Sequence, residues 1–177
     1  MERSSSSKSS ERYIRCATIA DIPAIVALIN EADQVYRAII PPELWREPFV
    51  TKERLLQEWA EREYLVAMDG GEVVGVVCWE VIGPAAYLGR LFVHPSRQRQ
   101  GIGRSLLETV ESKAKRAGCR LISLIVNPKA TWAVRFYEKH GYIKGEMDEL
   151  GKWAEAIRER LPQGSDWMVM VNKHGGS

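Results

Sequence analysis

The segment with the clearest capacity for chemistry is 97–105, whose sequence is RQRQGIGRS. It follows a predicted strand and opens a predicted amphipathic helix. The first amides of a helix have no partner within the helix, and the helix dipole adds about half a positive charge at that end. Gly101 and Gly103 allow an anion to approach the backbone closely, and three arginines add positive charge. The segment therefore predicts a binding site for a phosphate-bearing ligand. An ordinary glycine-containing turn before a helix is the alternative.

Two common phosphate-binding motifs do not match this segment. A dinucleotide-binding fingerprint needs a third glycine, but Leu106 stands there, and residues 121–123 lack the acidic residue that would bind a ribose. An ATP-binding P-loop needs a Gly-Lys pair followed by serine or threonine after a four-residue spacer, and this segment has neither that lysine nor that spacing. NAD and ATP are therefore disfavoured as ligands.

A mixed order of helices and strands surrounds this segment. Helices are predicted after Asp21 and Thr51, which are favourable N-cap residues. An Asp-Gly-Gly turn at 69–71 predicts a hairpin whose strands are apolar on both faces, and such strands lie in a sheet covered by helices. The remaining predicted elements are a strand at 86–93, a helix from 102, a strand at 121–126, a helix at 131–140, strands at 142–146 and 166–171, and a charged helix between 150 and 161. This order predicts an α/β (α+β) fold around one mixed sheet.

Length and composition restrict the class of protein. The chain has 177 residues, 45% hydrophobic and 27% charged, which suits one domain that buries its own core. We expect that domain at 12–172, with a disordered Ser-rich tail at 1–11 and a flexible C-terminus at 173–177. The net charge of +2 is small for a nucleic-acid-binding protein, and every apolar run is far shorter than the ~20 residues that span a bilayer. We therefore expect neither a nucleic-acid partner nor a membrane span.

Cysteine and histidine usage points to a reducing compartment. Cys16, Cys78 and Cys119 are odd in number and widely spaced, which favours reduced thiols. The three histidines are equally scattered, without the spacing of a zinc or iron site. The Ser-rich N-terminus lacks the apolar stretch of a secretory signal. We expect a cytoplasmic protein without a bound metal.

Two motifs together resemble the GNAT superfamily of acyl-CoA-dependent N-acyltransferases. The family hallmark, Q/R-x-x-G-x-G/A after a strand, is matched by Gln98, Gly101 and Gly103. The later segment FYEKHGY, at 136–142, resembles the family's second motif. The resemblance covers most of the chain. It implies a mostly antiparallel sheet with splayed central strands, flanked by helices, and an enzyme that uses acetyl-CoA.

The resemblance also implies which residues bind acetyl-CoA. Backbone amides in the phosphate-binding segment would hold the diphosphate, and the pantetheine would lie along the strand that ends at Val93. The family often has asparagine seven residues before the motif tyrosine, where this chain has Ala130, while Asn127 lies three residues earlier. The expected cofactor-binding residues are Leu91, Val93, Gln98, Arg99, Gln100, Gly101, Ile102, Gly103, Arg104, Ser105, Asn127 and Tyr137.

An N-acyltransferase must deprotonate its acceptor. An ammonium with a pKa near ~10.4 is neutral in about one molecule in 2,500 at pH 7, so deprotonation costs about 4.6 kcal/mol. We expect Glu80 to accept the proton, because simple alternation places it at the rim of an apolar strand face with Val74 and Cys78. Glu31, Asp33 and a water relay are the alternatives.

Two further catalytic roles follow from the resemblance. It implies that the N–H of Val93 stabilises the oxyanion that forms on the thioester oxygen. It also implies that Tyr137 protonates the departing thiolate. A phenol near pKa ~10 is a weaker acid than a thiol near ~8.5, so a hydrogen bond to the forming thiolate is the more economical role.

The acceptor is expected between the loop that joins the first two helices and the segment near the last strands. These regions offer Tyr36 and Trp45 on one side and Glu146, with acidic neighbours, on the other. Acidic residues attract a cation, which favours a small primary amine as acceptor. A lysine or N-terminal protein acetyltransferase and a non-catalytic acyl-CoA sensor are the alternatives. The predicted helix at 152–160 either covers the acceptor site or forms a homodimer contact.

Overall fold

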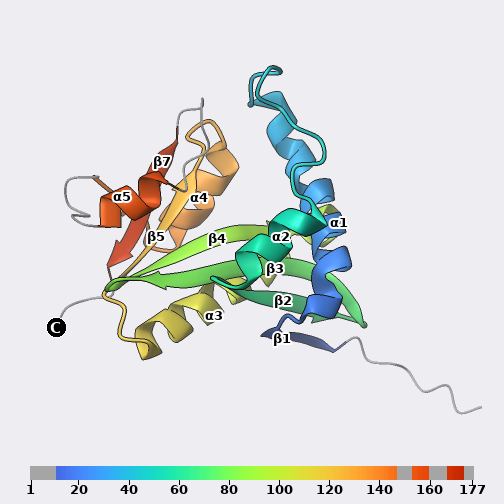
Figure 1. Ribbon diagram of the computed structural model, residues 1–177, viewed down its shortest axis with the longest axis horizontal. Helices are drawn as coiled ribbons and strands as arrows, with labels where there is room; N and C mark the ends of the chain where they lie inside the picture. The colour runs from blue at the N-terminus through green and yellow to red at the C-terminus, as the bar shows by residue number, and fades with distance from the viewer. Residues whose placement is uncertain (1–10, 147–152, 160–166, 174–177) are drawn as a thin grey trace, which may run out of the picture.

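The computed structural model describes residues 11–146, 153–159 and 167–173, which form a seven-stranded mixed sheet with helices on both faces (Figure 1). The strand order is β1-β2-β3-β4-β5-β7-β6. The strands are β1 (Arg12–Cys16), β2 (Glu63–Asp69), β3 (Glu72–Ile82), β4 (Ala85–Val93), β5 (Leu121–Val126), β6 (Ile143–Lys144) and β7 (Met168–Lys173). The helices are η1 (Ile19–Asp21), α1 (Ile22–Ala32), η2 (Asp33–Ala38), α2 (Lys52–Trp59), η3 (Pro95–Arg97), α3 (Ile102–Arg116), α4 (Thr131–Lys139) and α5 (Trp153–Arg158). The predicted mixed fold is confirmed.

Local turn and capping residues explain several of these elements. Gly70 and Gly71 both have positive φ, +61° and +83°, so they form the tight turn that joins β2 to β3. The Thr51 hydroxyl accepts a hydrogen bond from the Arg54 amide (3.2 Å) and begins α2 as predicted. Asp21 differs from expectation, because its carboxylate binds Arg15 (2.8 Å) and the Thr18 amide (2.7 Å) instead of capping α1.

Strand β1 was not predicted. It is an edge strand that pairs antiparallel with β2, and its side chains are exposed or half-buried. Its sequence is RYIRC, in which two arginines leave neither a long apolar run nor a regular alternation. A short edge strand needs little hydrophobic burial, so its sequence carries a weak signal.

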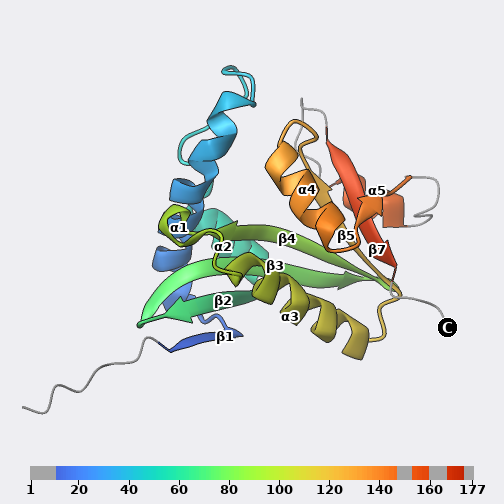
Figure 2. The ribbon, with the colours of Figure 1, turned by 180° about the vertical axis from the view of Figure 1, so that it is seen from behind.

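Helices cover the two faces of the sheet. Figures 1 and 2 show α1 and α2 on one face and α3 and α4 on the other. Ile25 and Ile29 of α1 are fully buried against β2 and β3, whereas Leu106 and Val110 of α3 are fully buried on the opposite side. A smaller core joins Ile157 of α5 to β5 and β7. The sheet centre is thus buried on both faces, as its apolar strands predict.

The central strands splay apart at the point where the site forms. All strand pairs are antiparallel except β4 and β5, which pair in parallel only along Ala85–Leu88 and Leu121–Leu124. Beyond Leu88, the described residues of β4 have no pairing partner on the β5 side. On the β3 side, Cys78 pairs with Gly89 and Val76 with Phe92, so β4 has one extra residue in a bulge. This divergence confirms the predicted splayed strands.

Part of the predicted organisation falls outside the described residues. Most of the predicted tail at 1–11 and of the C-terminus at 173–177 lies there, as do the two ends of the predicted helix at 152–160. Among the described helices, none is long and apolar enough to cross a membrane. Within the same residues there is no group of three or more His, Cys, Asp or Glu side chains that could hold a metal ion.

Candidate active site

The turn before α3 presents free backbone amides. Arg99 and Gly101 have positive φ, +62° and +79°, and Gly101 is the residue from which α3 begins. In the described part of the chain, the backbone N–H groups of residues 99–104 donate to no protein acceptor, and the Ser105 amide is the first to bond to a carbonyl, that of Gly101 (3.0 Å). These free amides lie just before and within the first turn of α3, and free amides at a helix N-terminus favour an anion. The predicted phosphate-binding turn therefore has the required geometry.

The three arginines of this turn do not share one role. Arg97 donates to the buried carboxylate of Asp69 (2.7 Å), which also accepts from Arg12 (3.0 Å), so Arg97 fastens the turn to the β2–β3 hairpin. Arg104 pairs with Glu108 on the exposed face of α3 (2.8 Å). Arg99 has no acidic partner among the residues that the structure describes, which leaves its charge available. The Gln100 side chain accepts a hydrogen bond from Arg12.

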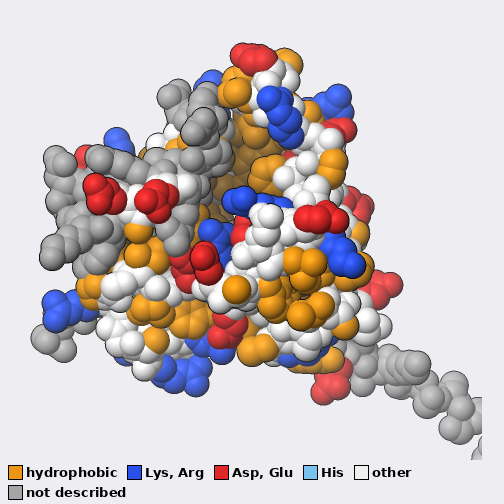
Figure 3. All heavy atoms as spheres, in the orientation of Figure 1, with side chains coloured by type: hydrophobic (Ala, Val, Ile, Leu, Met, Phe, Trp, Pro, Cys, Tyr) orange, Lys and Arg blue, Asp and Glu red, His pale blue; other side chains and the backbone are white. Residues whose placement is uncertain are grey.

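A pocket of about 700 Å³ lies where β4 and β5 diverge (Figure 3). Its walls come from η2 and α2 on one side, from the β4 bulge at the centre, and from β5 and α4 on the other. Hydrophobic side chains form its floor, and basic and acidic side chains gather at its edge. Three of the predicted cofactor or catalytic residues line this pocket, namely Leu91, Asn127 and Tyr137.

The side of the pocket formed by β5 and α4 is buried. Tyr137 is 9% exposed, and burial raises the pKa of its hydroxyl well above the usual value, with smaller contributions from Tyr36 and Tyr87. The Asn127 side-chain oxygen accepts from the Lys129 amide (2.9 Å) and so shapes the turn after β5. Ala130, at the position where the family often has asparagine, is fully buried at the start of α4.

The edge of β4 presents unpaired backbone to the gap. The His94 amide donates to the Val74 carbonyl of β3 (2.8 Å). Successive amides of a strand point to opposite edges, so the N–H of Val93 points away from β3 and toward the gap. Val93 was predicted to use this amide, and its placement is suited to that role.

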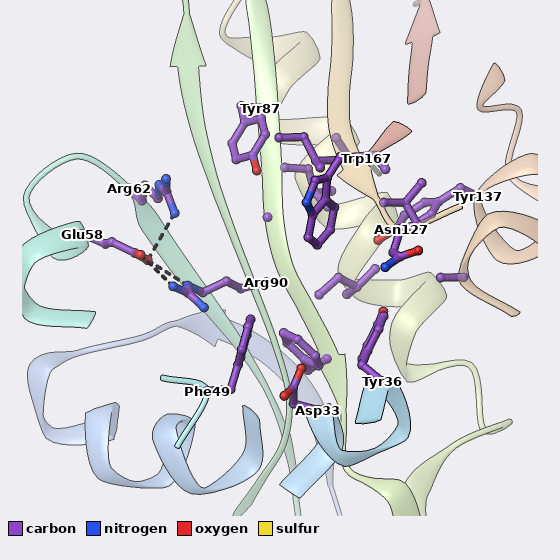
Figure 4. Close-up of a pocket in the computed structure, with 18 of the residues that line it drawn as sticks. Asp33, Tyr36, Phe49, Glu58, Arg62, Tyr87, Arg90, Asn127, Tyr137 and Trp167 are labelled. Carbon is purple, nitrogen blue, oxygen red and sulfur yellow. Dashed lines mark hydrogen bonds and ion pairs between the residues drawn. The ribbon is translucent and has the colours of Figure 1, made fainter. Parts of the chain in front are cut away.

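A cluster of charged residues on the other side of the pocket was not predicted. Glu58 of α2 accepts hydrogen bonds from Arg90 (2.7 and 2.8 Å) and from the Tyr64 hydroxyl (2.6 Å), and it pairs with Arg62 (3.2 Å) (Figure 4). Burial alone would raise the pKa of Glu58, but the hydrogen bonds and charge of Arg90 lower it to about 2. Arg90 stands at the β4 bulge with φ +49°, a conformation that is rare outside glycine. The cluster therefore holds a strained strand position in place.

Glu80 belongs to the edge of this cluster. Its carboxylate accepts from Arg62 (2.7 Å) and is 6% exposed, and it is not among the residues that line the pocket. It shares a face with Cys78 but not with Val74, which packs in the opposite core because β2 and β3 shift register nearby. The predicted face of Glu80 is therefore corrected in part, and its role as a base remains a prediction.

Asp33 is a second carboxylate at this pocket. It is 2% exposed, and its Oδ2 atom is buried without a hydrogen-bond partner. Burial raises the pKa of Asp33 to about 6, with Glu47 adding to the rise and Arg90 opposing it. Tyr36, one turn further along, also lines the pocket, and burial beside Asp33 raises its pKa to about 12.

The predicted acceptor residues are separated by the structure. Tyr36 lines the pocket, but Trp45 does not, and its indole N–H donates to Glu47 (3.0 Å). Glu146 is exposed and lies outside the pocket lining, and its acidic neighbours fall outside the described residues. The pocket is instead lined by Phe49, Tyr87 and Trp167, which come from three segments far apart in the sequence. Arg90, the one charged residue in the apolar strand β4, was the available sequence signal, whereas Glu58 lies in a helix with several other charged residues and did not stand out.

Solved structures share this fold. The PaiA N-acetyltransferase from Thermoplasma acidophilum, in complex with coenzyme A, is 24% identical with a TM-score of 0.75, over 93% of this chain and 99% of that one. The ribosomal-protein-S18-alanine N-acetyltransferase from Escherichia coli is 18% identical with a TM-score of 0.70, over 94% of this chain and 96% of that one. At these identities the likeness establishes the fold.

Sequence comparisons establish the family. The uncharacterized protein YdhI of Bacillus subtilis (strain 168) is 34% identical over 74 residues, which are 42% of this chain and 45% of that relative, so the match spans less than half of the relative's length. The model of the acetyltransferase (GNAT) family matches residues 28–142, more than half of this chain, including both motifs. The chain therefore belongs to the acetyltransferase (GNAT) family, the acyl-CoA-dependent N-acyltransferases that the two motifs predicted.

Proposed function

We propose that this protein transfers an acetyl group from acetyl-CoA to the primary amine of a small molecule by direct attack. The observation that carries the proposal is the row of unpaired amides at residues 99–104, which follows the strand β4 whose Leu91 and Phe92 line a pocket at the splayed strands. A diphosphate satisfies such amides, and a pocket on its flank leaves room for both the thioester and an amine.

The donor extends from this turn into the gap between β4 and β5. The amides of residues 99–104 hold the diphosphate, with the Ser105 hydroxyl and Arg99 nearby. The pantetheine lies along Leu91 and Val93, whose backbone edge is unpaired on the β5 side. It thereby replaces the missing strand contacts and brings the thioester toward Tyr137 and Asn127, which line the same pocket.

The chemistry at the thioester uses one amide and one phenol. When the amine attacks the carbonyl carbon, the thioester oxygen becomes negative, and the Val93 N–H donates to it. The carbon–sulfur bond then breaks, and the Tyr137 hydroxyl donates to the departing thiolate. Burial raises the pKa of Tyr137, so the phenol stays protonated throughout the neutral range and is available as a donor.

The acceptor side favours a small molecule. Besides Tyr36, its rings are Phe49, Tyr87 and Trp167, and Glu159 beside α5 contributes to the opposite wall. Aromatic faces and carboxylates suit a cationic amine. Trp45 and Glu146 contribute at most to the approach of this amine, because both lie outside the pocket lining. The three cysteines are free thiols, which is consistent with a cytoplasmic enzyme.

The donor half of the proposal is tested by calorimetry with a matched pair of glycine variants. Gly101 and Gly118 have nearly equal φ, +79° and +81°, and an added Cβ meets nothing within 4 Å at either position. Gly101→Ala therefore strains the backbone about as much as Gly118→Ala, but only the first distorts the amide turn. We expect weaker acetyl-CoA binding for Gly101→Ala alone. Equal binding by both variants would contradict the proposed diphosphate site.

The acceptor half is tested by thiol release from acetyl-CoA against amines, polyamines, amino acids and peptides. We expect turnover with a small amine. Turnover restricted to peptides would identify a protein acetyltransferase, and tight acetyl-CoA binding without turnover on any acceptor would identify a sensor.

A further inference from the structure

Asp33 is a buried carboxylate whose charge no hydrogen bond or ion pair in the described residues stabilises. It follows α1 directly, where the negative end of the helix dipole disfavours a second negative charge. Its Oδ2 atom is buried and accepts no hydrogen bond, and within the described residues Asp33 takes part in no ion pair. A buried unsatisfied carboxylate destabilises a protein unless something else makes use of it. Its position in the pocket lining points to the acceptor.

The charges around Asp33 leave it free to exchange a proton. Arg90 on β4 attracts its carboxylate, but the Arg90 guanidinium makes its hydrogen bonds to Glu58. Glu47, from the loop before α2, repels the Asp33 charge, and Tyr36 lies on its own segment. Asp33 is therefore influenced by one cation without being paired to it.

Asp33 also lies on the route to the leaving group. Figure 4 shows Asp33, Tyr36, Asn127 and Tyr137 following one another along one side of the pocket. Tyr36 interacts electrostatically with Asp33 and also with Tyr137, which places it between them. An amine bound beside Tyr36 is thus close to a proton acceptor on one side and to the thioester site on the other.

We propose that Asp33 is the catalytic base that takes the proton from the acceptor ammonium, an inference that rests on the proposed function. The ammonium gives one proton to the Asp33 carboxylate and becomes a neutral amine. Its nitrogen forms the bond to the thioester carbon, and the carbon–sulfur bond breaks. The second proton of the attacking nitrogen passes to the thiolate through the Tyr137 hydroxyl, which gives its own proton to the sulfur and takes the one from nitrogen. Asp33 returns its proton to solvent, so the sum is acetylated amine, free thiol and one released proton.

The neighbouring carboxylates are less suited to this step. Glu58 accepts hydrogen bonds from Arg54, Arg90 and Tyr64 and pairs with Arg62, so its oxygens are already occupied. Glu80 is held by Arg62 and does not line the pocket. Asp33 combines burial, an unpaired oxygen and a place in the lining, which neither of these residues does.

The test compares Asp33→Asn with wild type across pH, using the best amine from the thiol-release assay. Asparagine has the same shape but cannot take the proton, so we expect kcat at pH 7 to fall about 100-fold or more. At pH 10 about a third of a lysine-like amine is already neutral, so the deficit should shrink to a few-fold. In wild type, kcat/KM should fall below about pH 6, where Asp33 becomes protonated. In the variant it should instead fall steadily with the neutral fraction of the amine, without a separate break near pH 6.

Three controls distinguish a proton acceptor from a residue that only shapes the pocket. Asp33→Asn should bind acetyl-CoA with wild-type affinity by calorimetry, whereas failure of wild type to bind would contradict the proposed function instead. Glu43→Gln, which changes an exposed carboxylate in the following loop, should leave activity unchanged. Asp33→Glu should recover part of kcat. A kcat at pH 7 within threefold of wild type, a deficit equal at pH 7 and pH 10, or an effect on the amine KM alone would each overturn the assignment.

Discussion

The donor and acceptor sides of the pocket are built in different ways. The donor side is a continuous turn with free backbone amides, and the positive φ angles of Arg99 and Gly101 set its shape. The acceptor side is assembled from side chains of η2, α2, β4 and the segments before β2 and β7, which meet only in the folded chain. Its charged groups are also part of the core, so function and stability are coupled there. The donor turn lies at the surface, where the two are separable.

The largest effect should come from the charged cluster. Glu58→Gln leaves Arg90 largely buried with only a neutral partner and leaves Arg62 with Glu80 alone, so we expect the free energy of unfolding to fall by about 3–5 kcal/mol. The pKa of Glu58 is lowered to about 2, so this stabilisation is present above about pH 4.5 and lost as the pH falls toward 2. Urea unfolding at several pH values measures both.

The matched control for this variant is an exposed ion pair. Glu108→Gln removes the partner of Arg104 on the surface of α3 and should change the unfolding free energy by less than about 1 kcal/mol. Equal effects of the two substitutions would show that the cluster has no special structural role.

The next substitution, Asp33→Asn, should raise the free energy of unfolding instead of lowering it. Because burial raises the pKa of Asp33 from 3.8 to about 6, its ionised form is disfavoured in the folded state. The protonated acid therefore adds to the stability of the folded state. This added stability is fully present below pH 3.8 and is lost as the pH rises through 6. Asp33→Asn should therefore stabilise the protein at pH 8 by up to about 3 kcal/mol, while lowering activity. Thermal unfolding at pH 8 measures this, and a destabilised variant would assign Asp33 a structural role.

On the donor side a smaller effect is expected, confined to binding. Gly101→Ala should weaken acetyl-CoA binding about tenfold and lower stability by about 1 kcal/mol, because alanine is strained at positive φ. Gly118→Ala should lower stability equally and leave the affinity unchanged. If both variants lost affinity together, the loss would come from stability rather than from the turn.

The smallest effect is expected at the second glycine of the motif. A Cβ at Gly103 would lie 3.6 Å from both Phe136 and Val93, which is ordinary van der Waals distance, and its φ is not positive. Gly103→Ala should therefore keep acetyl-CoA affinity within about threefold of wild type by calorimetry. A loss as large as that of Gly101→Ala would mean that the ligand approaches the backbone at this point more closely than the turn suggests.

The fold could be predicted wherever local residues determine it. The Gly70–Gly71 turn, the Thr51 cap and the apolar strand at 121–126 each carry their own signal, and the structure has them as predicted. Strand β1 was missed because its pairing to β2 depends on a neighbour far along the chain, as in the pairing of Arg12 with Asp69. Val74 was placed on the wrong face because a register shift interrupts the strand alternation.

The same distinction between local and long-range determinants applies to the candidate site. The turn at 97–105 was recognisable because its glycines and the helix start lie within one short segment. Arg62, Arg90 and Glu58 were not, because their partners come from three different elements and only the fold brings them together. Asp33 was named among several carboxylates, but its unpaired oxygen became visible only in three dimensions.

The measurement that tests the central claim most directly is an amide chemical-shift titration with CoA and, in parallel, with pantetheine, which lacks the diphosphate. If the turn clasps the diphosphate, CoA should shift the amide resonances of residues 99–104, and pantetheine should shift only those near Leu91, Val93 and Tyr137. CoA binding that leaves residues 99–104 unshifted would contradict the account.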